Sequence, residues 1–88
     1  MYKIKLSPEE RKDLIISMKK IVGQMQAVID VVENDKVREQ TLTQLLAVKG
    51  GTTKVCKDII SHGVLKHIKD YKFEDLDKAL TIIFKLDS

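Results

Sequence analysis

Several residue types are scarce in this sequence, and each shortage argues against a class of protein. The 88 residues include no tryptophan, one proline, four glycines and one cysteine. So little proline and glycine argues against a turn-rich β-sandwich. The single cysteine, Cys56, cannot form an internal disulfide, which excludes a disulfide-stabilised secreted scaffold. The longest uncharged stretch is far shorter than the ~20 apolar residues that a membrane-spanning helix needs.

Signals for export and for catalysis are missing as well. Residues 1–7 lack the apolar segment of a secretory signal peptide, so we expect a cytoplasmic protein. No glycine-rich phosphate loop, activated nucleophile or pair of catalytic carboxylates is visible, so we do not expect an enzyme. A chain this short buries only about 60% of its unfolded surface by itself. We therefore expect a single domain, residues 1–88, that needs a partner chain.

The first part of the sequence predicts one long helix. Ser7 can cap the free N–H groups of a helix that begins at Pro8, and Glu10 completes a capping box. Apolar residues then recur alternately every four and three positions, which is typical of a helix in a bundle. They are Leu14, Met18, Ile21, Met25, Val28 and Val32, with a second line at Ile15, Val22 and Ile29. This pattern predicts a helix from Pro8 to about Glu33.

Two more helices are expected after a break at Glu33-Asn34-Asp35. Apolar spacing predicts a second helix from about Lys36 to Ile68. Each glycine of Gly50-Gly51 costs about 1 kcal/mol inside a helix, so the helix is either broken there or held continuous by packing, and the unchanged phase of the apolar spacing favours continuity. A turn at Lys69-Asp70-Tyr71 then precedes a shorter helix marked by Phe73, Leu76, Leu80 and Ile83. The expected fold is all-α. Because the short helix cannot cover two long apolar stripes, we expect an antiparallel dimeric four-helix bundle, with a tetramer as the larger assembly.

Basic residues are concentrated in two segments, although the net charge is only +3. Residues 1–20 carry six basic and three acidic side chains, and residues 36–57 carry five basic and one acidic. Such segments favour a cationic face that binds DNA phosphates, but an ordinary solvated helix surface explains them equally well. The candidate DNA-binding residues are Lys12, Lys19, Lys20, Lys49 and Lys54. No helix-turn-helix or zinc-finger pattern is visible, so a DNA contact would use an unusual surface.

The side chains that bind metal ions best are few in this chain. On one helix, Cys56 and His67 would lie about 16 Å apart along the axis, too far to share an ion. His62 and His67 are five residues apart, whereas a spacing of four brings two imidazoles to one metal. We therefore expect no metal or other cofactor, unless these three residues meet across a subunit interface.

Longer segments of the chain carry a more specific signal. The segment Met18-Lys19-Lys20-Ile21-Val22-Gly23-Gln24-Met25 resembles the LKRIEGQV segment of the copper-sensitive operon repressor (CsoR) family. Glu33-Asn34-Asp35-Lys36 and Leu42-Thr43-Gln44-Leu45-Leu46-Ala47-Val48 resemble that family's EEDR and LTQLAAV segments at matching spacing. Leu76-Asp77-Lys78-Ala79-Leu80 also fits the family's third helix. The resemblance extends from about residue 10 to residue 85 without a gap.

The resemblance implies an all-helical transcriptional repressor that forms antiparallel dimers and usually tetramers. Members of the family bind operator DNA and leave it when an inducer binds. Their inducers include copper(I), nickel or cobalt, formaldehyde and sulfane sulfur. The resemblance also implies that Lys19, Lys20 and Lys54 retain the basic character of the family's DNA-binding surface, whereas Ser17 replaces a usual arginine.

Most positions that bind inducers in the family hold other residues in this chain. The family's first cysteine falls on Arg38, its second-helix histidine on Gly63, and an early histidine of some members on Ile16. His67 alone keeps a side chain that can coordinate a metal at a family ligand position. The Arg38 guanidinium would moreover place a permanent positive charge beside an incoming cation.

These departures favour a CsoR-like repressor of a stress, metal or detoxification operon whose inducer is not the family's usual metal. The inducer would be an anionic or small polar molecule, or would be absent. One alternative is a helical oligomeric interaction protein that has lost regulated DNA binding. Another is a metal sensor with relocated ligands, namely His62, His67 and Cys56 from neighbouring subunits. The expected partners are duplex operator DNA, further copies of the chain and an unknown inducer, without a membrane.

Overall fold

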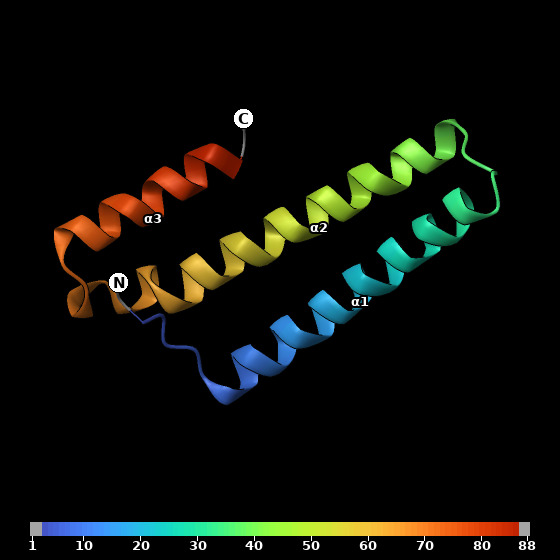
Figure 1. Cartoon of the computed structure of the whole chain (residues 1–88). Helices are drawn as coiled ribbons and strands as arrows, with labels where there is room; N and C mark the ends of the chain where they lie inside the picture. Colours follow the sequence, from blue (N-terminus) through green and yellow to red (C-terminus); the bar gives the residue numbers. More distant parts are fainter. Residues whose placement is uncertain (1–2, 87–88) are drawn as a thin grey trace.

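The computed structural model describes residues 3–86, and Figure 1 shows an elongated all-α chain. Helix α1 (Pro8–Glu33) and helix α2 (Glu39–Gly63) form an antiparallel hairpin. A 3₁₀ helix, η1 (Leu65–Asp70), leads to helix α3 (Phe73–Leu86), which folds back beside α2 on the side away from α1. The overall dimensions are 51 × 29 × 17 Å. The prediction of an all-α fold with two long helices and one short helix is confirmed.

The predicted bounds of α1 are correct because both ends are set by local hydrogen bonds. The Glu10 N–H donates to the Ser7 hydroxyl at 3.0 Å, and the Ser7 N–H donates to the Glu10 carboxylate at 2.8 Å. At the other end, the N–H groups of Asp35 and Lys36 donate to the carbonyls of Val32 and Val31, at 3.1 and 2.9 Å. This is a Schellman motif with Asp35 in the left-handed conformation at φ 54°.

The predicted bounds of α2, about Lys36 to Ile68, were wrong at both ends. Lys36 closes the Schellman motif of α1, so it cannot begin the next helix, and Arg38 is still extended at φ −148°. The chain becomes helical at Glu39, where the Thr41 hydroxyl accepts the Arg38 N–H at 3.2 Å. The α-helix ends at Gly63, and the tighter η1 follows, with non-helical dihedral angles at His67 (φ −118°, ψ 38°).

Helix α2 is continuous through Gly50-Gly51, as the sequence predicts. A Cβ atom at Gly51 would lie 3.2 Å from the Ile21 side chain of α1, tighter than ordinary van der Waals contact. Gly51 therefore lets the two long helices approach closely at their midpoints. Gly50 faces open space, so nothing in this chain requires a glycine there.

The best-packed part of the chain lies where α2 ends. Ile60, Val64 and Ala79 are buried there, and Cys56, Leu76 and Ile83 pack against them half-buried. Residues 3–6, which we call the N-terminal strap, cross this cluster and add Ile4 to it. The Tyr71 hydroxyl lies 2.8 Å from the Gly63 carbonyl oxygen and 3.2 Å from that of Lys3, and donates to both. These contacts join the start of the chain to η1 and the end of α2.

The apolar side chains of the hairpin are only partly covered within one chain. On α1, Leu14 and Val28 are buried against α2, whereas Val22 is 67% exposed and Ile15 is 47% exposed. Met18, Met25 and Ile29 of the same helix are exposed too, as are Leu42, Leu45 and Leu46 of α2. Much of the predicted apolar stripe is therefore uncovered within a single chain. Within residues 3–86, no helix is both long enough and apolar enough to cross a membrane.

Candidate functional site

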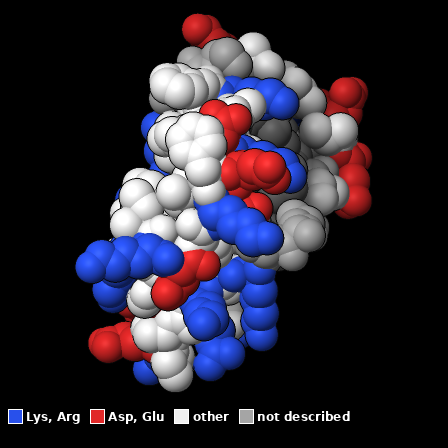
Figure 2. All heavy atoms as spheres, turned by 90° about the vertical axis from the view of Figure 1, so that its left-hand side faces the viewer, with Lys and Arg blue, Asp and Glu red and all other residues white. Residues whose placement is uncertain are grey.

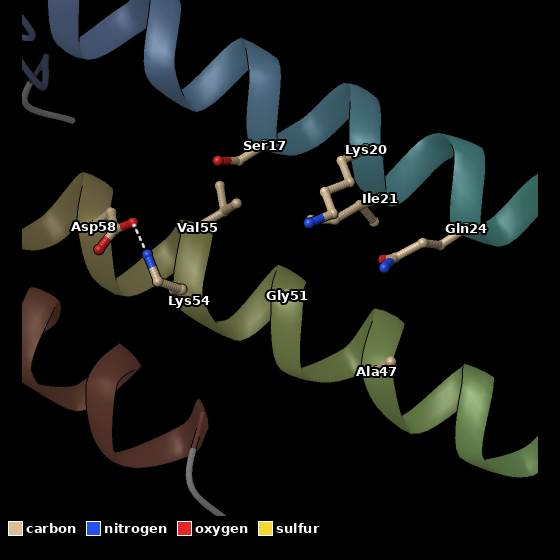
Figure 3. A pocket seen from close by; sticks show the side chains of 9 residues that line it. All are labelled: Ser17, Lys20, Ile21, Gln24, Ala47, Gly51, Lys54, Val55 and Asp58. Atoms are coloured by element: carbon tan, nitrogen blue, oxygen red, sulfur yellow. Dashed lines mark hydrogen bonds and ion pairs between the residues drawn. The ribbon is translucent and has the colours of Figure 1, made fainter.

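A groove between the two long helices brings together two of the predicted DNA-binding lysines. Lys20 of α1 and Lys54 of α2 line a hollow of about 300 Å³ (Figure 3). Its other lining residues are Ser17, Ile21, Gln24, Ala47, Gly51, Val55 and Asp58. In Figure 3 the Lys20 side chain extends from α1 toward α2. We call this hollow the lysine groove.

The two lysines of the groove are held differently. The Lys54 ammonium lies 3.1 Å from the Asp58 carboxylate, one turn further along α2. The Lys54 side chain is 77% exposed, so this ion pair contributes little to stability. Another anion can therefore replace the Asp58 carboxylate as the partner of Lys54. Among residues 3–86, no ion pair holds Lys20. A polyanion that enters the groove would therefore meet one unpaired ammonium and one weakly paired ammonium.

The other predicted DNA-binding lysines do not line this groove. Lys12 and Lys19 lie about 80° and 100° around α1 from Lys20, because each residue turns an α-helix by about 100°. Lys49 lies about 140° around α2 from Lys54 by the same geometry. One chain therefore presents the five lysines on more than one face. Their role in DNA binding stays a prediction.

A second basic region lies at the end of the molecule that carries the strap. Lys3, Lys5 and Arg11 line one hollow there, and Lys66 and Lys69 line another. Figure 2 looks at this end and shows Lys and Arg side chains gathered in the lower half of the view, with fewer Asp and Glu among them. The sequence pattern does not place these residues together, because the strap meets η1 only in the folded chain.

Glu10 connects the start of α1 to the end of α2. Its carboxylate lies 3.3 Å from Nδ1 of His62 and 3.6 Å from the Lys66 ammonium. The hydrogen bond from the Ser7 backbone N–H is the main reason that the pKa of Glu10 lies below its ordinary value. The Ser7 hydroxyl, Lys66 and His62 lower this pKa further, and partial burial opposes them. Glu10 is therefore a structural anion at neutral pH.

The three effector positions named from the sequence are spread along the molecule. Arg38 precedes the first residue of α2, Gly63 is the last residue of α2, and His67 lies in η1. A helix of 25 residues is about 37 Å long, so one chain keeps Arg38 far from the other two. Any site that uses all three must combine two copies of the chain.

The Gly63 position is filled by the chain itself. Gly63 is buried, and a Cβ atom there would overlap the Ile4 side chain and lie 3.3 Å from Leu6. Because the Gly63 carbonyl also accepts the Tyr71 hydroxyl, the strap and η1 close over this residue from two sides. Any residue with a Cβ atom at this position would clash with the docked strap.

Comparison with known proteins identifies the family. The model of the metal-sensitive transcriptional repressors matches residues 10–85, which is most of the chain. The chain belongs to this family. No match was found among curated proteins or among solved structures.

The residues of this repressor do not fit a metal at the family's ligand positions. Arg38 offers no lone pair to a metal, Gly63 has no side chain, and Ile16 is an exposed hydrocarbon on α1. His67 is half-buried in η1. Among residues 3–86, no group of three His, Cys, Asp or Glu side chains is arranged to hold a metal ion. Cys56 and His62 belong to the core cluster and to the Glu10 contact, respectively.

The contributions of Ile4 and Tyr71 to this region were not predicted from the sequence. The alternation of Ile4-Lys5-Leu6 indicates an extended apolar segment, and Gly63 directly after a predicted helical run indicates a close approach. Neither signal shows that Ile4 contacts Gly63. This contact depends on the path of η1, and the apolar spacing of the sequence predicts an α-helix there instead of a 3₁₀ helix.

Proposed function

We propose that this metal-sensitive repressor binds duplex operator DNA as an oligomer, through the lysine groove of each copy. The observation that carries the proposal is the position of Lys20 and Lys54 on two helices that face one hollow. Two ammonium groups beside one groove suit contacts with the phosphates of a DNA backbone, and such contacts need no recognition helix. Lys12, Lys19 and Lys49 would contact DNA from other faces, or from other copies in the assembly.

Assembly is supported by the apolar side chains that one chain leaves exposed. A single chain buries only a few hydrophobic residues, whereas most of the α1 stripe stays accessible. Apolar surface of this extent normally marks an interface. An antiparallel dimer would cover it and would repeat the lysine groove, so modest contacts in each copy would add together.

We propose that the inducer is an anionic or small polar molecule rather than the family's usual metal, or that this repressor has no inducer. Arg38 would repel a cation, and Gly63 with its docked strap leaves no ligand where the family has a histidine. An operon for stress, metal handling or detoxification remains the expected target, by analogy with the family. A metal sensor that uses His62, His67 and Cys56 from neighbouring copies is the second candidate.

DNA binding is tested on the assembled wild-type protein with duplex DNA from upstream of its own gene. We expect Lys20→Ala or Lys54→Ala to weaken binding to all sequences similarly and to lower the salt dependence by about one unit for each lost contact. Lys78→Ala, which removes an exposed lysine of α3, is the matched control and should change neither quantity. A folded oligomer without preference for this DNA over random DNA would favour a helical interaction protein instead.

Metal response is tested by calorimetric titration with copper(I), nickel(II) and zinc(II). We expect weak binding or none, and no change in DNA affinity. Submicromolar binding that releases DNA would contradict this expectation and support relocated ligands. His67→Ala would then be the first variant to examine, because His67 is the family ligand position that can still coordinate.

A further inference from the structure

A second hollow adjoins the lysine groove and is lined by three carboxylates. It has a volume of about 290 Å³ and lies between the same two helices, nearer the start of α1. Ser17, Lys54 and Asp58 line both hollows. The further lining residues of the second hollow are Glu10, Asp13, Leu14 and His62. We call it the acidic hollow, and we call the two hollows together the interhelical groove.

The spacing of polar residues on α1 gives the interhelical groove one acidic and one basic end. Asp13, Ser17, Lys20 and Gln24 are separated by four, three and four residues. At about 100° per residue, all four fall within about 60° on one side of α1. Asp13 and Lys20 are seven residues apart, which is about 10 Å along the helix. The carboxylate of the acidic hollow and the ammonium of the lysine groove therefore lie in one line along α1.

The charges at the two ends of the interhelical groove are available to a ligand. Within residues 3–86, neither Asp13 nor Lys20 forms an ion pair. The Lys54–Asp58 pair, drawn as a dashed line in Figure 3, lies between them, since both of its residues line both hollows. A ligand with an anionic end and a cationic end could replace this exposed pair by one contact to Lys54 and one to Asp58.

The acidic end of the interhelical groove suits an organic ammonium group. Glu10 is not available there, because His62 and Lys66 lie 3.3 and 3.6 Å from its carboxylate and its side chain is only 16% exposed. Asp13 and Asp58 remain as acceptors from the two helices. In the part of the chain that the structure describes, no three His, Cys, Asp or Glu side chains are arranged to hold a metal ion. An ammonium group needs only hydrogen-bond acceptors of negative charge.

The basic end of the interhelical groove suits a phosphate. The ammonium groups of Lys20 and Lys54, the Ser17 hydroxyl and the Gln24 amide offer hydrogen-bond donors from both helices. A phosphate has about two negative charges and three strong acceptor oxygens, so it can accept from several of these donors together. Apart from Asp58, the other residues of the lysine groove are apolar or glycine, and they would contact the carbon atoms of a ligand.

We propose that the interhelical groove binds a small molecule with a phosphate at one end and an ammonium group at the other, and that this molecule competes with operator DNA. The phosphate would lie between Lys20 and Lys54, and the ammonium group between Asp13 and Asp58. The competition rests on the proposed function, because both ligands would need the same two lysines. A DNA backbone has no cationic group for the acidic hollow, so this hollow would favour the small ligand.

The first test compares probes that differ by one charged group. Phosphoethanolamine carries both charged ends, inorganic phosphate carries one and ethanolamine carries the other. Each is titrated into the DNA-free wild-type protein at constant ionic strength, and binding is followed by nuclear magnetic resonance. We expect phosphoethanolamine to bind roughly fivefold more tightly than inorganic phosphate, which is the size of one favourable exposed ion pair, and ethanolamine to bind most weakly. Equal affinities for phosphoethanolamine and phosphate would overturn the proposal.

Substitutions then assign each end of phosphoethanolamine to its residues. Asp13→Asn should lower the affinity for phosphoethanolamine roughly fivefold and should not lower the affinity for phosphate. Lys20→Ala should weaken the binding of both. Asp77→Asn and Lys78→Ala change exposed residues of α3 and are the matched controls, which should alter neither affinity. Thermal unfolding checks that each variant stays folded. An equal loss for both probes in Asp13→Asn would contradict an ammonium site at Asp13.

A second test measures competition with DNA. Phosphoethanolamine is added to the complex of wild-type protein and operator DNA, and sodium chloride keeps the ionic strength constant because salt alone weakens DNA binding. If the two ligands compete, the apparent Kd for DNA rises in proportion to the phosphoethanolamine concentration without a limit. If the small ligand binds elsewhere, the apparent Kd reaches a plateau, because protein, DNA and ligand then form a ternary complex. A plateau would overturn the competition.

The outcomes separate this inference from the proposed function. A protein that binds phosphoethanolamine through Asp13 but does not bind DNA would remove the proposed function and the competition, and would leave the ligand site in place. A protein that binds DNA through Lys20 and Lys54 but does not prefer phosphoethanolamine to phosphate would overturn the ligand site and leave the proposed function in place.

Discussion

The two ends of the hairpin are completed in different ways. At the strap end, Ile60, Val64 and Ala79 form a buried cluster that Ile4 and α3 cover. At the turn end, Val32, Val37 and Leu42 are all more than half exposed, and local hydrogen bonds set the path of the chain through the turn. One chain therefore completes its own core where four segments meet, and leaves much of its remaining apolar surface exposed. Intrachain stability comes mainly from the strap end, and the proposed assembly would use the exposed face.

The largest effect is expected from a charge on the exposed apolar face. Met25→Lys should dissociate the oligomer or prevent folding, because an unpaired charge at a packed interface costs several kcal/mol. Light scattering measures the result as a shift to the 10.0 kDa monomer. Ile16→Lys is the matched control, since Ile16 is exposed on the outer side of α1. An unchanged oligomer in Met25→Lys would mean that this face does not form the interface.

Two glycine substitutions test the strap end against open helix surface. Gly63→Ala should destabilise the fold by about 1–3 kcal/mol, because its Cβ overlaps Ile4 and must push the strap aside. Gly50→Ala should stabilise it by up to about 1 kcal/mol, because nothing lies within 4 Å of the new Cβ. Urea unfolding gives both values. Equal effects at the two positions would refute a docked strap.

A smaller loss of stability is expected when the strap keeps its packing but loses its hydrogen bond to Tyr71. Tyr71→Phe removes the hydroxyl that donates to the carbonyls of Gly63 and Lys3. The expected cost is about 0.5–1.5 kcal/mol in urea unfolding. Hydrogen exchange of the residues around Gly63 should accelerate, whereas exchange at the middle of α1 should not. Uniform acceleration along the chain would argue for a general loss of stability instead.

The smallest expected effect is on the stability of the fold at acid pH. Because the pKa of Glu10 in the folded chain lies below its ordinary value of 4.5, ionised Glu10 stabilises the fold above that pH. This contribution is lost as the pH falls through the lowered pKa. Glu10→Gln should therefore flatten the acid limb of a stability–pH profile measured by thermal unfolding. Glu9→Gln removes the same charge without the contacts to Ser7 and His62, and should leave that limb close to wild type.

Local chemistry decided which parts of the fold the sequence predicted. Ser7, Pro8 and Glu10 lie within one helical turn, so the start of α1 was predicted to the residue. The Schellman motif at Asp35 was missed because this position usually holds glycine, and the error moved the predicted start of α2. The end of α2 was missed because apolar spacing continues in phase into η1.

The candidate site was predictable where it depends on one helix and unpredictable where it depends on two. Lys20 and Lys54 were named from composition and resemblance, but their common groove follows from the close contact of Ile21 with Gly51. The family resemblance predicted that Gly63 stands where other members have a histidine. That Ile4 fills it depends on a contact between residues 59 positions apart in the sequence, which no local pattern specifies.

The strap also has a consequence for the order in which the chain folds. The Tyr71 hydroxyl and the Lys3 carbonyl are separated by 68 residues, so their contact closes nearly the whole chain into a loop. The α1–α2 hairpin needs a much shorter loop, through the turn at Asn34 and Asp35, and loop-closure entropy favours it first. During synthesis, residues 3–6 have no place to dock until Tyr71 has been made. We therefore expect the hairpin, with its lysine groove, to form while the strap is still free, and strap docking to be among the last steps of folding.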